Sequence, residues 1–158
     1  MGIEIERKYL INKDKWAGVT KSKGSNYRQG YILTAPDKTI RIRLTDEGGF
    51  ITIKGLSVQA SRPEFEYSIP VDDAKELLDA FCTSEVSKVR YKIMHGGKTW
   101  EVDEFKGANA GLILAEIELK SETEPFDVPD WVDKEVTGDK RYYNSNLSTN
   151  PYKNWHPQ

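Results

Sequence analysis

Hydrophobic and polar residues alternate along several short stretches of this chain, beginning with its first ten residues. Ile3 and Ile5 alternate with Glu4, Glu6 and Lys8. This period of two predicts a β-strand and places all three charges on one face of it. Taken alone, the stretch predicts an edge strand whose polar face meets water.

The same alternation predicts seven further strands. They are expected at residues 25–33, 39–45, 50–54, 64–69, 88–93, 98–105 and 112–120. Glycine-containing turns at residues 46–49 and 95–97 predict hairpins between consecutive strands. Residues 55–63 are expected to form a loop. A chain of mostly strands with a few helices favours an α+β fold on an antiparallel sheet.

The sequence predicts helices in four segments. Residues 71–82 change to a helical period, with an apolar stripe preceded by Asp72 or Asp73 as the cap. A single helical turn is expected near Trp16. The segment after Pro129 and residues 137–147 predict further helices, the last one capped by Thr137. We expect one domain over residues 1–158, with a core of about 1–147 and a loosely held tail at 148–158.

Composition and charge exclude several classes of function. The chain has 158 residues with 23 basic and 25 acidic side chains, so its net charge of −2 gives no general attraction to nucleic acid or anionic lipid. The single cysteine, Cys82, cannot form a disulfide within the chain and is expected to be a buried, inert thiol. The sequence shows neither a signal peptide nor a membrane span, so a cytoplasmic protein without a membrane partner is expected.

Along each predicted strand, every second residue lies on the same face; one of the two faces carries nearly all of the charges, and the other is apolar. We call the residues of the charged face the charged parity. The carboxylates of this charged parity are Glu4, Glu6, Glu64, Glu66, Glu101, Asp103, Glu116 and Glu118. Its cations are Lys8, Arg41, Arg43, Lys54, Lys88, Arg90, Lys92 and Lys120. Two arrangements satisfy the pattern. An open sheet can leave the charged face in water, or the strands can close into a barrel with the charges inside.

The closed arrangement makes a chemical demand. Buried charges cost several kcal/mol each unless they are paired, solvated or liganded. Lysine and arginine suit phosphate oxygens, whereas carboxylates would repel a bare polyphosphate. Carboxylates become useful if they hold Mg²⁺ or Mn²⁺, which bridge carboxylate and phosphate groups. A charged interior therefore predicts a site for a divalent metal and a triphosphate or polyphosphate.

The motif Glu4-x-Glu6-x-Lys8 resembles the signature of the CYTH superfamily, the triphosphate tunnel metalloenzymes. Further motifs fall in the family's order, at residues 27–31, 40–43, 53–54, 64–66, 88–91, 101–103, 115–118 and 136–142. The resemblance covers roughly residues 1–147, and the compact length is similar to that of small bacterial members. It implies an eight-stranded antiparallel closed β-barrel that forms a triphosphate tunnel, with helices packed outside and a C-terminal helix near one end.

The resemblance also implies roles for individual residues. Those expected to hold or serve the metal are Glu4, Glu6, Glu64, Glu66, Asp103, Glu116 and Glu118, of which Glu116 and Glu118 could instead orient water. Those expected to bind phosphate are Lys8, Arg41, Arg43, Lys54 and Arg90, with Lys140 and Arg141 closing one end of the tunnel. Lys88 and Tyr31 match a pair that assists water activation or neutralises charge.

These features lead to a principal hypothesis and several alternatives. The principal one is a metal-dependent triphosphatase that hydrolyses inorganic tripolyphosphate with Mg²⁺ or Mn²⁺, as a monomer or homodimer without a nucleic-acid partner. The alternatives are a class IV adenylate cyclase, a thiamine or nucleoside triphosphatase, and a module that binds polyphosphate without turnover. The sequence does not identify a pocket for an organic group.

Overall fold

The computed structural model describes residues 2–155, which form nine strands and six short helices. The strands are β1 (Ile3–Ile11), β2 (Ser25–Ala35), β3 (Lys38–Thr45), β4 (Gly48–Gly55), β5 (Ser61–Ile69), β6 (Ser84–His95), β7 (Lys98–Phe105), β8 (Ile113–Glu118) and β9 (Val132–Glu135). The α-helices are α1 (Lys13–Ala17), α2 (Val71–Ala80) and α3 (Asn144–Thr149). The 3₁₀ helices are η1 (Gly107–Asn109), η2 (Lys140–Tyr142) and η3 (Tyr152–Asn154).

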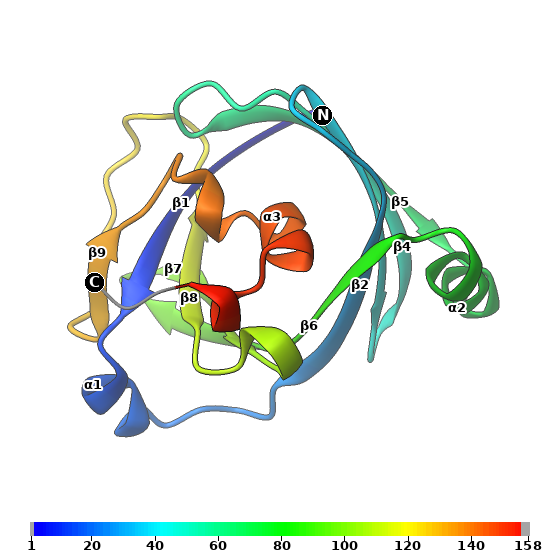
Figure 1. The fold of residues 1–158 in the computed structure, drawn as a ribbon. Helices are drawn as coiled ribbons and strands as arrows, with labels where there is room; N and C mark the ends of the chain where they lie inside the picture. Colours follow the sequence, from blue (N-terminus) through cyan, green and yellow to red (C-terminus); the bar gives the residue numbers. More distant parts are fainter. Residues whose placement is uncertain (1, 156–158) are drawn as a thin grey trace.

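The first eight strands form a closed antiparallel barrel, which Figure 1 shows in a view into its interior. The strands follow one another in the order β5-β4-β3-β2-β6-β7-β8-β1, and a pairing between β1 and β5 closes the ring. This closing pairing is short, running from Ile3 opposite Pro63 to Ile5 opposite Ser61. The prediction of a closed eight-stranded barrel is therefore confirmed, and the open sheet is excluded.

Closure turns the charged parity of the strands toward the interior. A β-bulge in β2 adjusts this pattern: Tyr31 lies opposite Arg41 and Leu33 lies opposite Ile40, so Ile32 is an extra residue in the strand. Tyr31 therefore faces the interior together with Arg41, while Leu33 lies on the outer face with Ile40. The bulge marks the point where the regular alternation read from the sequence shifts by one residue.

Apolar side chains of the opposite parity pack under an outer layer of helices and loops. Trp16 on α1 meets Trp131 and Tyr91 with ring centroids 5.1 and 6.0 Å apart, and Trp131 also meets Trp100 on β7. On the far side of the barrel, α2 covers β2, β3 and β4, where its residue Leu78 packs with the buried Ile42. These two packed clusters hold the barrel wall from outside.

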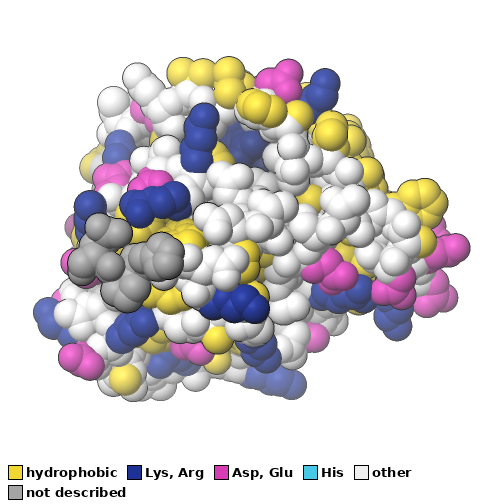
Figure 2. Space-filling view, in the orientation of Figure 1, with side chains coloured by type: hydrophobic (Ala, Val, Ile, Leu, Met, Phe, Trp, Pro, Cys, Tyr) yellow, Lys and Arg dark blue, Asp and Glu magenta, His cyan; other side chains and the backbone are white. Residues whose placement is uncertain are grey.

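Along part of its length, the outer face of β4 and β5 is not covered by any helix formed by residues 2–155. Ile53, Phe65 and Tyr67 are 41%, 48% and 58% exposed there. The space-filling view shows apolar side chains gathered on this side of the molecule (Figure 2). The barrel wall is thus supported unevenly from outside.

The C-terminal segment enters one end of the barrel and fills it, as the position of α3 in Figure 1 shows. Leu147 of α3 and Tyr142 of η2 belong to a buried cluster with Val86, Phe105 and Leu114, which come from β6, β7 and β8. Tyr152 and Trp155 pack against the same cluster. Residues 148–155 therefore extend the packed structure, while the end of the predicted loose tail, residues 156–158, lies outside the described residues.

The helix predictions have mixed outcomes. The turn near Trp16 and the helix from residue 71 are confirmed, although Pro70 stands at the cap position of α2 and no side chain caps it. The helix predicted after Pro129 is wrong, because β9 forms there. It pairs with the part of β1 that β5 leaves free, with Tyr9 opposite Glu135. No helix in the described part of the chain has the length and apolar character needed to cross a membrane.

The prediction of one helix over residues 137–147 is also wrong. That stretch contains η2 and only the first residues of α3. Thr137 does not cap a helix. Its hydroxyl instead accepts a hydrogen bond from the backbone N–H of Lys8, which ties the segment to β1. Asp139 takes the capping role at η2, since its side chain accepts a hydrogen bond from the Arg141 N–H.

Candidate active site

A cavity of about 90 Å³ lies inside the barrel and is lined mainly by charged side chains. The charged residues come from six strands and are Glu4, Glu6, Lys8, Arg41, Arg43, Lys54, Arg62, Glu64, Lys88, Arg90 and Glu116. Tyr31, Tyr143 and Asn144 complete much of the remaining wall. Most of the residues predicted from strand parity are therefore brought together around one space.

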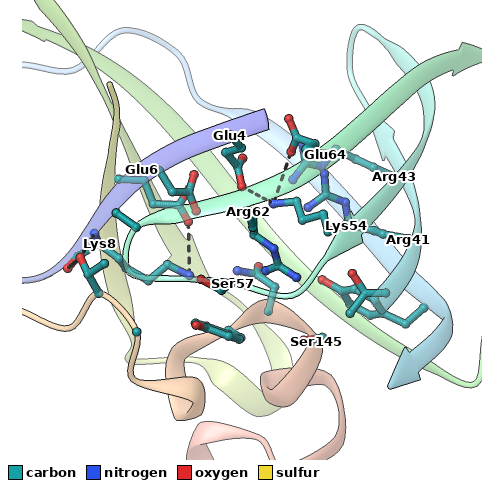
Figure 3. A pocket seen from close by; sticks show the side chains of 18 of the residues that line it. Glu4, Glu6, Lys8, Arg41, Arg43, Lys54, Ser57, Arg62, Glu64 and Ser145 are labelled. Carbon is teal, nitrogen blue, oxygen red and sulfur yellow. Dashed lines mark hydrogen bonds and ion pairs between the residues drawn. The ribbon is translucent and has the colours of Figure 1, made fainter. Parts of the chain in front are cut away.

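The carboxylates of β1 and β5 share a lysine from β4. Lys54 Nζ lies 3.0 Å from Glu4 Oε1 and 3.4 Å from Glu64 Oε2, and Figure 3 shows the three side chains meeting at the cavity wall. Although burial alone would raise it, Lys54 lowers the pKa of Glu4 below its usual value. Glu4 is therefore a carboxylate anion paired with the Lys54 ammonium, and its oxygens could bind a metal ion in place of that lysine.

Glu6 differs from its neighbours because it has no ion pair or side-chain hydrogen bond within residues 2–155. Burial, together with the nearby carboxylates of Glu116 and Glu4, raises the pKa of Glu6 well above its usual range. Glu116 itself is held as an anion: although burial opposes it, Lys8 and Arg90 keep its pKa well below the usual value. A cation placed among Glu4, Glu6 and Glu116 would relieve their mutual repulsion.

Lys8 lies on the opposite side of this carboxylate group. Its Nζ is 3.6 Å from Glu116 Oε1, donates to the Tyr142 carbonyl oxygen at 3.2 Å and lies 5.6 Å from the centroid of the Tyr143 ring. The first contact comes from β8, and the other two come from the C-terminal segment. Lys8 is thus oriented into the cavity by both walls.

The two arginines of β3 form a positive wall that has few anionic partners. Arg41 reaches Glu66 Oε2 at 3.4 Å, and its buried Nε has no hydrogen-bond partner in the described part of the chain. Burial and the nearby positive charges of Arg41 and Arg90 lower the pKa of Arg43 to about 10, so it remains charged at neutral pH. Excess positive charge and an unsatisfied donor are what an anion site requires.

A third group of charges lies deep in the barrel. Asp103 accepts two hydrogen bonds from Arg90, at 2.8 and 2.9 Å, and pairs with Lys88 Nζ at 2.7 Å. Burial, reinforced by repulsion from Arg90 and Arg43 and opposed by Asp103, lowers the pKa of Lys88 to about 7. Lys88 is 1% exposed yet still borders the cavity. It is therefore a lysine that can lose its proton near neutral pH.

Some predicted site residues lie elsewhere. Asp103 does not line the cavity, because Arg90 and Lys88 occupy both of its oxygens. Glu118 is exposed at the end of β8, opposite Glu6, and burial and the charges of Glu4 and Glu101 raise its pKa. Glu66 is also exposed and supports Arg41 and Thr52 from the rim.

The two cations predicted to close the tunnel end do not reach the inner cavity. Arg141 is exposed and pairs with Asp139, with its Nη2 2.7 Å from Oδ2 of that aspartate. Lys140 lines an adjoining cavity of about 1000 Å³ between the C-terminal segment and the loop after β4. The two cavities share Arg62, Ser57 and Tyr143, so they adjoin each other. Figure 2 shows basic side chains in a hollow on this face.

Sequence reasoning missed several residues of the cavity wall. The sequence predicts a loop at Arg62, whereas in the structure Arg62 belongs to β5 and has the same parity as Glu64. It donates a hydrogen bond to the Gly55 carbonyl oxygen at 2.9 Å. Its register with Glu4 on β1 could not be seen without the barrel closure. Gln29 and Asn144 are neutral, so the pattern of charges along the strands does not reveal them.

The donor chemistry fits a hard divalent cation such as Mg²⁺ or Mn²⁺. Glu4, Glu6 and Glu116 offer carboxylate oxygens next to a basic wall suited to phosphate. Among residues 2–155, no three His, Cys, Asp or Glu side chains are close enough to form a complete metal site on their own. Mg²⁺ in particular is commonly held by one or two carboxylates, with substrate phosphates and water as the other ligands.

Comparison with known proteins places this barrel among relatives. Residues 2–149 match the CYTH domain family. An inorganic triphosphatase of Acetivibrio thermocellus is 51% identical over 156 residues, which is 98% of this chain and 99% of that relative. One of Nitrosomonas europaea is 37% identical over 154 residues, covering 92% and 96%. The solved structure of the inorganic triphosphatase NE1496 has a TM-score of 0.63 at 32% identity, covering 98% of this chain and 97% of that one.

Proposed function

The chain belongs to the CYTH domain family, and from this premise we propose that it is a metal-dependent triphosphatase that hydrolyses inorganic tripolyphosphate. Relatives of nearly equal length that are named inorganic triphosphatases support the reaction. The observation that carries the proposal is the interior cavity, where Arg41, Arg43 and Lys54 face Glu4 and the other carboxylates across a small enclosed space.

The basic side chains bind the phosphate chain in this proposal. Arg41 and Arg43 lie on one wall, and Lys8 lies on the other, so a triphosphate between them would be contacted along its length. Lys54, Arg62 and Arg90 supply further donors. Charge-assisted hydrogen bonds of this kind stabilise the negative charge that spreads over the transferred phosphoryl group. Lys140 and Arg141 are left outside this role.

The carboxylates of Glu4, Glu6 and Glu116 are the side chains that would hold Mg²⁺ or Mn²⁺, with Glu64 at the edge of the group. Such an ion neutralises phosphate charge and lowers the pKa of a bound water. Glu118, exposed at the end of β8 opposite Glu6, would orient water. Asp103 and Glu66 would act on the basic wall, because their contacts are with Lys88, Arg90 and Arg41.

Lys88 and Tyr31 are proposed to act on the attacking water. The lowered pKa of Lys88, about 7, makes its neutral amine available as a base at neutral pH. Tyr31 is 3% exposed and borders the same cavity, so its hydroxyl can donate to water or to a phosphate oxygen. The two groups would therefore place and deprotonate water in a space from which bulk solvent is largely excluded.

The test is a panel of substrates with product analysis. Tripolyphosphate, pyrophosphate, ATP and thiamine triphosphate are each incubated with Mg²⁺ or Mn²⁺, and phosphate and cyclic AMP are measured. We expect phosphate release from tripolyphosphate that stops when the metal is chelated. Cyclic AMP from ATP would instead favour the cyclase alternative. Tight binding of polyphosphate without turnover would favour the binding module.

Glu6→Gln tests the carboxylate group within the same panel. The change keeps the shape of the side chain and removes the carboxylate that would bind the metal, so we expect turnover to fall by about 10²–10³ while the protein remains folded. Arg7→Ala is the matched control on the same strand. Arg7 faces outward, pairs with Glu135 at 3.1 Å and should leave turnover unchanged. Equal activity of the two variants would refute the proposed carboxylate role.

A further inference from the structure

The C-terminal helix contributes a side chain to the wall of the cavity. Asn144, the first residue of α3, accepts a hydrogen bond from Lys88 Nζ to its Oδ1 at 2.9 Å. The same Oδ1 accepts a second hydrogen bond from Gln29 Nε2 at 3.2 Å. Asn144 thus joins the lysine of β6 to a glutamine of β2 inside the barrel.

Gln29 is completely buried and stands at the centre of this group. Its Oε1 accepts from Arg43 Nε at 3.2 Å, and its Nε2 donates both to Asn144 and to the Tyr31 hydroxyl oxygen, also at 3.2 Å. The resulting chain runs from Arg43 through Gln29 to two ends, namely Tyr31 and the Asn144–Lys88 pair. Each of its members is polar, and each bond lies within hydrogen-bonding distance.

The direction of every bond in this chain is fixed by Arg43. A guanidinium can only donate, so the oxygen of Gln29 must face it and the amide nitrogen must face the other way. Asn144 must then present its oxygen to that nitrogen, and Tyr31 must accept through its hydroxyl oxygen. The Tyr31 proton is consequently directed away from Gln29. The hydrogen bonds allow only one assignment of the two amides.

The same chain fixes the orientation of the Lys88 amine. Two of its tetrahedral directions are taken by Asp103, at 2.7 Å, and Asn144, at 2.9 Å. The third direction is thereby determined, and Lys88 borders the cavity. Removal of Asn144 would leave the amine held by Asp103 alone and free to rotate about that contact.

We propose that Gln29 and Asn144 are positioning residues, which aim the Tyr31 hydroxyl and the third direction of the Lys88 amine into the cavity. This inference rests on the proposed function, since it concerns the two groups assigned there to the attacking water. It assigns the C-terminal helix a part in catalysis. The contact comes from Asn144 and not from the neighbouring basic residues Lys140 and Arg141.

The helix does not need these hydrogen bonds to stay in place. Leu147 is fully buried in the apolar cluster at the end of the barrel, and Ser148 is hydrogen-bonded to Ser84 at 2.8 Å. α3 is therefore anchored by its second half. The hydrogen bonds of Asn144, its first residue, are therefore not needed to hold the helix in place. Their loss should affect turnover more than folding.

The first test compares Asn144→Ala with Asn144→Asp in the holoenzyme. Alanine removes the acceptor, and we expect kcat to fall about tenfold to a hundredfold, the range typical of outer partners that orient catalytic groups. KM for tripolyphosphate should stay within about threefold, because the basic wall is untouched. Aspartate keeps an oxygen for both donors, but its charge raises the pKa of Lys88, so it should restore most of kcat only at a pH high enough to deprotonate that amine. An unchanged kcat in Asn144→Ala would overturn the proposal.

Gln29→Glu tests the direction of the chain. Glutamate can still accept from Arg43, but it cannot donate to Tyr31 or Asn144. We expect kcat to fall by a similar factor, and the double variant with Asn144→Ala to lose less than the product of the two single losses, because the residues act as one unit. Fully multiplicative losses would show that the two amides act independently.

Asn12→Ala is the control for a loss of stability alone. Asn12 caps α1 outside the barrel and accepts from the Lys15 N–H at 3.1 Å. Its loss should lower the free energy of unfolding by about 1 kcal/mol and leave kcat unchanged. If Asn12→Ala reduced kcat as much as Asn144→Ala, the effect would reflect folding, and the positioning role would be rejected.

A measurement without turnover separates this inference from the proposed function. With ¹⁵N-lysine labelling at about pH 6, the ammonium of Lys88 is charged and its buried protons should exchange slowly enough to give an NMR correlation. The signal should persist in Asn12→Ala and Asn144→Asp and weaken in Asn144→Ala. If the wild-type protein does not hydrolyse tripolyphosphate, the proposed function fails. If the Lys88 signal is unaffected by Asn144→Ala, the positioning role fails.

Discussion

At one end of the barrel the inward-facing side chains are charged and line a cavity, whereas at the other end they are apolar and covered by the C-terminal segment. Single strands cross from one region to the other. On β6 the inward parity passes from Val86 to Lys88, and on β8 it passes from Leu114 to Glu116. We call these regions the charged half and the apolar half of the interior.

The contrast shows how the barrel can tolerate its buried charges. Ion pairs out of water contribute little net stability, and they are strongly destabilising when one partner is lost. The apolar half needs no such compensation, since each buried leucine or phenylalanine stabilises the fold by about 1.5–3 kcal/mol. We infer that the apolar half stabilises the fold and that this stability offsets the cost of burying the functional charges in the charged half.

Of the changes in the charged half, Asp103→Asn should destabilise the protein most. The change removes the only carboxylate within hydrogen-bonding distance of both Arg90 and Lys88 among residues 2–155. Buried Lys88 then loses its counter-charge, and Arg90 keeps only its longer contacts with Glu101, at 3.3 Å, and Glu116, at 3.9 Å. We expect the free energy of unfolding, measured by urea denaturation, to fall by about 3–5 kcal/mol. Asp79→Asn removes an exposed pair with Arg28 and should cost less than about 1 kcal/mol. Equal losses would mean that burial does not distinguish the two pairs.

Leu112→Ala should weaken the apolar half without touching the charged half. Leu112 is 4% exposed in the cluster around Leu147, and its truncation leaves a cavity. We expect a loss of about 2–5 kcal/mol in the free energy of unfolding. The kcat of the folded protein should remain that of wild type. Leu56→Ala, at an exposed position in the loop after β4, is the matched control and should be nearly neutral.

Strand alternation was sufficient to predict the barrel wall and most of the charged half. Arg41 and Arg43, for example, are assigned to one face by a period of two, and closure turns that face inward. The apolar half also left a signal, since Val86 and Phe105 interrupt the charged parity of their strands with apolar side chains. That interruption marks where the C-terminal segment enters.

The remaining features depend on partners that are distant in the sequence. β9 is short and polar, and it forms a strand because β1 has a free edge beyond its pairing with β5. Arg62 enters the site through that same closing pairing. Arg141, expected to close one end of the tunnel, does not line the cavity, and its guanidinium pairs with Asp139, two residues away. Gln29 and Asn144 carry no charge, so only their hydrogen bonds reveal them.

The pH dependence of turnover tests the link between the two halves at Lys88. The pKa of about 7 means that the amine is protonated below pH 7 and has a free electron pair above it. If the amine acts as a base, kcat should rise about tenfold per pH unit below pH 7 and level off above it. The measurement uses saturating tripolyphosphate and excess metal across neutral pH.

Lys88→Met is the variant that isolates this ionisation. It keeps the length of the side chain but has no titrating group, so its residual kcat should lose the rise through pH 7 that the wild-type enzyme shows. A wild-type kcat that falls through pH 7 would assign Lys88 the opposite role, as a cation that neutralises phosphate charge. In both roles the lowered pKa has one principal cause, the burial of the amine, whose Nζ lies 5.5 Å from the centroid of the Phe105 ring in the apolar half. The apolar region would then set the chemistry of the charged one.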